Sequence, residues 1–200
     1  GAPVIWFSME GISERLARHL AAGGEAWVLE AGWLCHCSGS SRAPLLRAQE
    51  IPATFGGAAR HNIANALGAA ALSHALGAPK EAIKAGLSSF GARPSDNPGR
   101  CQLYEHQEVR LILDFGHNPH GVEAMLQMAR QMSAERSGGR LWVSIGQAGD
   151  RSDEDLYGLS DAIGRAKPEM VSLREIVGYE RGRARGESAE ILADRLCAQG

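Results

Sequence analysis

Polar side chains gather directly after an apolar run in residues 111–121, LILDFGHNPHG. The apolar run is typical of a buried strand, which we expect to end near Phe115. Asp114, His117 and Asn118 then follow within a few positions. A carboxylate at the carboxyl end of a strand can accept hydrogen bonds from both hydroxyls of a ribose, as in Rossmann-type sites. The stretch is therefore either a ligand-binding edge or an ordinary polar turn.

Two residues of this stretch also have simpler interpretations. Pro119 suits the first position of a helix, and Asn118 would then be its N-cap, accepting a hydrogen bond from a backbone N–H. His117 and His120 are spaced as half of a metal site, which keeps a metal-dependent hydrolase open as a third class of function. No cluster of carboxylates accompanies them in the sequence, so we assign no metal ligand.

Two further segments could bind anionic or charged groups. Arg100 follows Pro98 and Gly99, and a guanidinium pairs with phosphate oxygens in a bidentate way. A surface arginine without a ligand is the alternative. Residues 146–151, GQAGDR, come at the end of another expected strand. The sequence contains no Gly-x-x-x-x-Gly-Lys-Ser/Thr loop, the usual phosphate-binding motif.

Asn62 and Asn65 are a second candidate binding pair, in an alanine-rich stretch that predicts a helix. Residues three apart share a helix face. Asparagine is unfavourable inside a helix, so two on one face need a reason. A capped or solvated helix start is the alternative to a binding role.

The pattern of the whole chain predicts two domains. The Gly- and Pro-containing segment 91–99, GARPSDNPG, is typical of a linker, and we place the boundary between domains 1–95 and 96–200. In the first domain we expect strands at 4–7, 26–29, 33–37 and 45–46, a helix at 12–20 and a helical hairpin at 58–90. In the second we expect strands at 101–104, 109–115, 141–145 and 170–173, and helices at 122–132, 156–163 and 188–196. This alternation predicts an α/β fold with a mostly parallel sheet.

Composition excludes several classes of protein. The 200 residues carry a net charge of −2, and 44% are hydrophobic. The charge argues against a nucleic-acid partner, and the apolar runs are too short to cross a membrane. Four cysteines without zinc-site spacing are typical of reduced thiols in a cytoplasmic protein. A homo-oligomer stays open.

Four stretches together resemble the Mur ligase superfamily in their order and spacing: ARHNIANALGAAALSHALG (59–77), NPGR (97–100), LDFGHNP (113–119) and GDRSDED (149–155). The resemblance implies that residues 1–95 are the end of a central P-loop-type ATPase domain, with short strands and a helical hairpin. It implies that residues 96–200 are a Rossmann-like C-terminal domain, which we expect to be truncated. Within the superfamily, the chain resembles the ligase half of cyanophycin synthetases most. Folylpolyglutamate synthases and peptidoglycan-precursor ligases are the alternatives.

The resemblance implies an ATP-dependent ligase that joins a carboxylate to an amine through an acyl phosphate. It implies ATP and Mg²⁺ as cofactors, with the Mg²⁺ ligands mostly outside this chain, and an amino acid or peptide as substrate. For ATP, the implied roles are adenine contact for Asn62 and Asn65, phosphate contact for Arg100 and ribose binding for Asp114. His117 and Asn118 would shape the nucleotide pocket. For the substrate, the implied role of Asp150 and Arg151 is contact with the amino acid.

The chain also departs from the family pattern. Phe115-Gly116 stands where the motif usually has Tyr-Ala, and the phosphate-binding loop is missing. We therefore expect this polypeptide alone not to catalyse ligation. A degenerate, non-catalytic ligase module is the alternative from another class of function.

Overall fold

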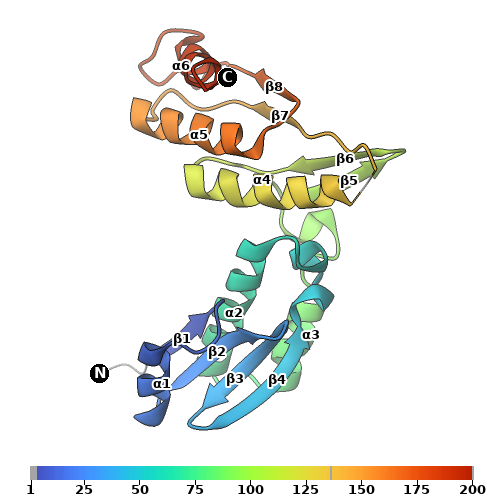
Figure 1. Cartoon of the computed structure of the whole chain (residues 1–200), viewed down its shortest axis with the longest axis vertical. Coiled ribbons are helices and arrows are strands. Elements are labelled where there is room, and N and C mark those ends of the chain that lie inside the picture. The colour runs from blue at the N-terminus through green and yellow to red at the C-terminus, as the bar shows by residue number, and fades with distance from the viewer. Residues whose placement is uncertain (1–3, 136, 200) are drawn as a thin grey trace. The chain divides into compact units, whose positions relative to one another are not determined.

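The computed structural model describes residues 4–135 and 137–199, and the chain divides between Pro98 and Gly99 into two compact units. We call residues 1–98 unit 1 and residues 99–200 unit 2. The division falls within segment 91–99, slightly beyond the predicted boundary after residue 95. Both units combine strands with helices, so the fold is mixed α/β (Figure 1). Of the helices described, none has the length and apolar character needed to cross a bilayer.

Unit 1 is built on a four-stranded sheet in the order β1-β2-β3-β4. Its strands are β1 (Ile5–Ser8), β2 (Glu25–Glu30), β3 (Trp33–Ser38) and β4 (Ser41–Arg47). Strand β1 pairs with β2 in parallel, whereas β2, β3 and β4 form an antiparallel meander. The turn between β2 and β3 is tight because Ala31 and Gly32 both adopt left-handed backbone angles. Strand β4 is longer than the predicted 45–46.

The α-helices in the described part of unit 1 are α1 (Glu14–Ala21), α2 (Arg60–Ala75) and α3 (Lys80–Ser89). Helix α1 starts after the predicted position because Ser13 caps it, accepting a hydrogen bond from the Leu16 N–H at 3.3 Å. Helices α2 and α3 form the predicted helical hairpin, and Pro79 lies at the N-cap of α3.

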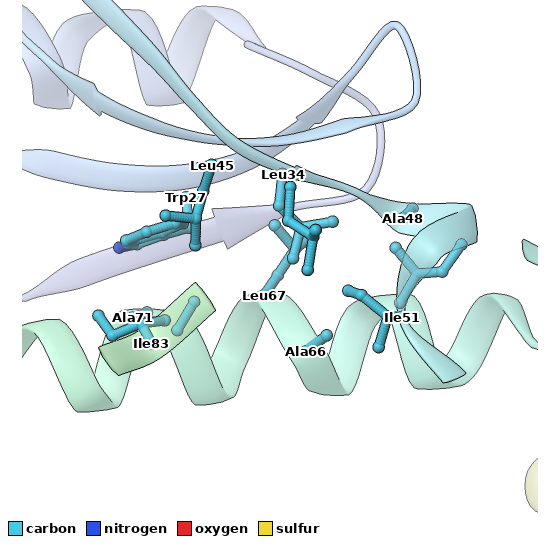
Figure 2. Close-up of a cluster of buried hydrophobic side chains, with 12 residues drawn as sticks. Trp27, Leu34, Leu45, Ala48, Ile51, Ala66, Leu67, Ala71 and Ile83 are labelled. Carbon is cyan, nitrogen blue, oxygen red and sulfur yellow. The ribbon is translucent and has the colours of Figure 1, made fainter. Parts of the chain in front are cut away.

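Helices α1 and α2 cover opposite faces of this sheet. Successive strand residues point to opposite faces. Val28 packs in one cluster with Leu16 of α1, while its neighbour Trp27 packs in another with Leu67 of α2. Figure 2 shows Trp27 and Leu34 pointing from the strands towards α2. Trp27 is fully buried, so this tryptophan belongs to the core rather than to a binding surface.

In its described residues, unit 2 contains two strand pairs and three α-helices. They are β5 (Gln102–His106), β6 (Val109–Leu113), α4 (Pro119–Ala134), β7 (Trp142–Ile145), α5 (Asp153–Ala166), β8 (Met170–Leu173) and α6 (Glu187–Cys197). Its core joins the helices to β7 and β8 through residues such as Leu126, Leu156 and Leu192. Helix α4 packs against α5, which packs in turn against α6.

The predicted mostly parallel sheet is present only in part. Strands β7 and β8 pair in parallel, but β5 and β6 pair antiparallel, and in the described residues the two pairs form separate sheets. The reason is the two-residue turn at Gln107 and Glu108, because a connection this short can join only antiparallel strands. Strand β6 also leaves Leu111 59% exposed, unlike a strand buried on both faces in a parallel sheet.

Candidate functional site

Asp114 lies directly after β6 and joins two loops of unit 2. Its Oδ2 accepts a hydrogen bond from the Cys101 N–H at 2.8 Å, and its Oδ1 accepts one from the Gly116 N–H at 2.8 Å. The carboxylate is half-buried. A carboxylate offers about four acceptor positions, so these two bonds leave capacity for further donors. Asp114 therefore has a structural role that sequence reasoning did not foresee, whereas ribose binding stays a prediction.

Arg100 lies at the same edge of unit 2 as Asp114. The Phe115 N–H donates to the Gly99 carbonyl at 2.8 Å, which aligns the two chain segments. The Arg100 guanidinium lies over the Phe115 ring, 5.1 Å from its centroid. Arg100 is exposed, and Phe115 is 65% exposed. The structure thus places a cation and an open aromatic face beside the carboxylate.

The interpretation of Asn118 and Pro119 as a helix start is confirmed. The Asn118 Oδ1 accepts a hydrogen bond from the Gly121 N–H at 2.8 Å, and Pro119 is the first residue of α4. The Asn118 amide nitrogen lies 3.4 Å from the His117 Nε2. The His117 ring lies 5.3 Å from that of Phe115, so His117 borders the same edge.

Sequence reasoning missed Gln147, which links the ends of two strands. It follows β7, is only 8% exposed, and its Nε2 donates to the Gly116 carbonyl at 2.8 Å. The loop after β7 is therefore tied to the loop after β6, although the two strands belong to separate sheets in the described residues. The available signal was a glutamine two residues after the end of a predicted strand.

Cys101 is held in a form that cannot act as a nucleophile. Burial, reinforced by the neighbouring Asp114 carboxylate, raises the pKa of this thiol to about 12. Its Sγ lies 3.5 Å from the Asp114 Oδ2. Because the thiolate is the reactive form, Cys101 is inert at neutral pH.

Asp150 and Arg151 lie in a network of charged groups between the loop after β7 and the segment before α6. Asp150 pairs with Arg181 at 2.5 Å, and hydrogen bonding from Arg181 holds the pKa of the Asp150 carboxyl below its usual range. The Arg151 carbonyl accepts a hydrogen bond from Arg183 at 2.7 Å. Arg183 also pairs with Asp153 at 2.5 Å.

A pocket adjoins this network within unit 2. The residues that line it are Gln147, Gly149, Glu175, Ile176, Tyr179, Glu180, Arg183, Ala184, Gly186, Ser188 and Ala189. Gly149 has no room for a side chain, because a Cβ there would lie 1.8 Å from the Glu180 carbonyl oxygen. Asp150 and Arg151 directly follow this glycine and so flank the pocket.

Asn62 and Asn65 belong to unit 1, at the start of α2. The Asn62 amide donates to the Ala53 carbonyl at 2.7 Å, and the Asn65 amide donates to the Asn62 Oδ1 at 3.2 Å. Asn62 therefore ties α2 to the preceding 3₁₀ turn (Pro52–Gly57), which contains the left-handed residues Phe55 and Gly56. Asn65 is exposed.

The pair His117 and His120 lacks a third metal ligand. In residues 4–135 and 137–199, the one group of three potential ligands that lie close enough together is Glu25, His36 and His74. The described residues therefore do not support the hypothesis of a metal-dependent hydrolase at residues 117–120.

Comparisons with known proteins assign the chain to a family. A family model described as Mur ligase, glutamate ligase domain, matches residues 99–200. The chain is 32% identical over 196 residues to a cyanophycin synthetase from Crocosphaera subtropica, covering 98% of this chain and 22% of that protein. It is 34% identical over 193 residues to a cyanophycin synthetase from a Nostoc species, covering 96% of this chain and 20% of that protein.

One solved structure, a folylpolyglutamate synthase from Thermotoga maritima, matches with a TM-score of 0.48 and 22% identity, covering 94% of this chain and 42% of that one. The chain spans about a fifth of the length of the curated relatives that it matches. The family match covers all of unit 2, which carries Arg100, Asp114, His117 and Asn118. The chain belongs to the Mur ligase family.

Proposed function

We propose that the chain is part of an ATP-dependent ligase that joins a carboxylate to an amine, similar to cyanophycin synthetases. The observation that carries this proposal is the arrangement of two adjoining segments of unit 2: the Cys101 N–H, next to Arg100, donates to Asp114, and Arg100 lies over the exposed ring of Phe115. The cyanophycin synthetase relatives support the finer assignment, because the similarity extends over nearly the whole chain.

The residues at this edge fit a nucleotide. Asp114 is anchored by two backbone N–H groups and keeps acceptor capacity for ribose hydroxyls. Arg100 offers a planar set of donors to phosphate oxygens. We assign ribose binding to Asp114 and phosphate contact to Arg100, while His117 and Asn118 shape the same pocket through the Phe115 ring and the start of α4.

We assign adenine contact to Asn62 and Asn65. An amide can donate to a ring nitrogen of adenine and accept from its exocyclic amine, as asparagine does when it reads adenine in nucleic acids. The bond from Asn62 to Ala53 orients the first asparagine, which in turn accepts a hydrogen bond from the second. Asn65 is exposed, so its amide can contact a ligand.

We assign the amino acid or peptide substrate to the charged groups at Asp150 and Arg151, beside the pocket of unit 2. Both signs of charge are present there: the Asp150 carboxylate paired with Arg181, and the Arg151 side chain, whose Nε is buried without a hydrogen-bond partner in the described structure. An amino acid carries both an ammonium and a carboxylate, so such a mixed site can hold either end.

The proposed reaction has two steps. A substrate carboxylate oxygen takes the terminal phosphoryl group of ATP, which leaves ADP and an acyl phosphate. The amine nitrogen then attacks the carbonyl carbon, the C–O bond to phosphate breaks, and the nitrogen loses a proton. Arg100 would stabilise charge on the phosphates, and Mg²⁺ would share that task. No residue of this chain is assigned to Mg²⁺.

The experiment measures ADP release by the full-length protein encoded by the gene, with a panel of carboxylate and amine substrates. We expect turnover that depends on ATP and on both substrates, and formation of an amide product. The substrate that supports turnover separates a cyanophycin-type activity from folate or peptidoglycan-precursor ligation. Absence of ADP release with every pair would favour the non-catalytic module.

A further inference from the structure

Three potential metal ligands meet in unit 1, on the sheet face covered by α2. Glu25 begins β2, His36 lies in β3, and His74 lies in the last turn of α2. His36 pairs across the strands with Trp27, two residues after Glu25, so the Glu25 and His36 side chains lie on one face. Trp27 packs against α2 on that face, which brings His74 onto it.

The distances match those of a coordination sphere. The Glu25 Oε2 lies 3.1 Å from the His74 Nε2 and 3.6 Å from the His36 Nε2, and all three ligand atoms lie within 4.8 Å of one another. In a tetrahedral zinc site with bonds of about 2.0–2.1 Å, neighbouring ligand atoms lie roughly 3.3–3.4 Å apart. A metal ion placed among these atoms would therefore require only small side-chain movements.

His36 supplies an independent indication of a ligand. Its side chain is 10% exposed, and its Nε2 has no hydrogen-bond partner in the described part of the chain. Buried polar atoms are normally satisfied, so an orphaned ring nitrogen aimed at two other ligands needs an explanation. Burial, with His74 nearby, lowers the pKa of His36, while Glu25 partly offsets this shift.

We propose that Glu25, His36 and His74 bind a divalent transition-metal ion, with Zn²⁺ as the preferred species. Two imidazoles and one carboxylate form a known zinc ligand set, and they leave the fourth position for water. Solvent can reach this position, because the side chains of Glu25 and His74 are 38% and 26% exposed. The ion would connect β2, β3 and α2 and so stabilise unit 1.

The neighbouring charges and thiols are compatible with this assignment. Among residues 4–135 and 137–199, Lys80 is the further cation that acts on His36, and the Glu25 carboxylate has the opposite effect. Cys35 and Cys37 flank His36 but point to the opposite face, where they pack with Leu16 of α1.

The test uses the 200-residue chain, stripped of metal with a chelator. Zn²⁺ is titrated against a chromophoric chelator, and Tm is measured with and without Zn²⁺. We expect one Zn²⁺ per chain with a Kd of about 10 μM or tighter. Since binding only to the folded state stabilises it, zinc should raise Tm by about 4 °C or more.

The partly exposed ligands provide the informative variants, because His36→Gln could unfold the sheet. Loss of a ligand should weaken binding at least about a hundredfold in Glu25→Gln and in His74→Gln, since even outer-shell partners are worth 10–100-fold. Both variants should fold, with their zinc-free far-UV circular dichroism unchanged. His106→Gln removes an exposed histidine of unit 2 and should bind zinc as tightly as the wild type.

Three outcomes would overturn the proposal. The first is a folded wild type that binds Zn²⁺ only at millimolar concentration. The second is an unchanged affinity in Glu25→Gln and His74→Gln. The third is a loss of binding in the double variant His117→Gln, His120→Gln, which would move the site to unit 2.

Discussion

The Asp114 carboxylate accepts a hydrogen bond of 2.8 Å from the backbone N–H of Cys101, thirteen residues earlier in the chain. This bond holds the segment that carries Arg100 against the end of β6. A second bond, from the Gly116 N–H at 2.8 Å, orients the other carboxylate oxygen. One side chain thus positions the proposed phosphate-binding residue and remains able to accept from a ribose.

Asp114→Asn should weaken both folding and ATP use. The new NH₂ group would face a backbone donor, and one hydrogen bond would be lost, at a cost of about 1–3 kcal/mol. Urea unfolding of the chain measures this cost. In the full-length protein, KM for ATP should rise more than the loss of stability explains. Asp194→Asn, at an exposed position of α6, is the control. An equal KM for ATP in both variants would contradict ribose binding by Asp114.

Arg100→Ala should weaken ATP binding with little effect on stability. The side chain is exposed and contacts the Phe115 ring, whereas a charge-assisted bond to phosphate is worth roughly 1.5–3 kcal/mol, or about ten- to a hundredfold in affinity. ADP release as a function of ATP concentration measures this loss, and Arg100→Lys should be intermediate. Arg140, an exposed arginine over the Trp142 ring at 5.5 Å, is the matched control. If Arg140→Ala had the same effect, phosphate contact by Arg100 would be excluded.

Gln147→Ala should loosen the edge formed by the two strand ends. It removes the bond to the Gly116 carbonyl and leaves a partly buried acceptor unsatisfied, which costs about 1–3 kcal/mol. Hydrogen exchange should become faster in residues 114–118, and KM for ATP should rise. Gln131→Ala, on the exposed side of α4, should change neither quantity. Unchanged exchange in Gln147→Ala would show that Gly116 is held by other contacts.

Gly149→Ala should disrupt the proposed substrate pocket. The added Cβ would lie 1.8 Å from the Glu180 carbonyl oxygen, so the backbone must move, at a cost of about 1–3 kcal/mol. KM for the amine substrate should rise in the full-length protein. Gly86→Ala in α3 is the control, because a Cβ there meets nothing within 4 Å and should stabilise the helix by about 0.5–1 kcal/mol. A normal amine KM in Gly149→Ala would place the substrate elsewhere.

Alkylation should distinguish Cys101 from Cys197. The pKa of the Cys101 thiol is raised to about 12, so it resists iodoacetamide at pH 8, whereas the exposed Cys197 is modified. Between pH 9 and about 12 the folded state keeps a proton that the unfolded state loses, so the stability contributed by this group falls as pH rises through that window. Peptide mass spectrometry after alkylation measures the two rates. Equal rates would contradict the burial of Cys101.

Local sequence patterns predicted much of unit 2. The cap of α4 by Asn118 and the order of strands and helices could be predicted because they depend on residues close together in the sequence. Over such short distances, the preference of each residue for a helix, strand or cap position decides the local structure. The mostly parallel sheet did not follow, because strand pairing depends on connections and burial far from each strand. The short turn at Gln107 and Glu108 was the local feature that should have indicated an antiparallel pair.

By itself the sequence determined the family, the two-part organisation and the types of most elements, since motifs and periodicity are local properties of the chain. Only the tertiary structure decided which distant side chains share a site. Gln147 reaches Gly116 across 31 residues, and His74 reaches Glu25 across 49. Such contacts arise from strand register and from the packing of helices on sheets, and neither is encoded in the spacing of neighbouring residues.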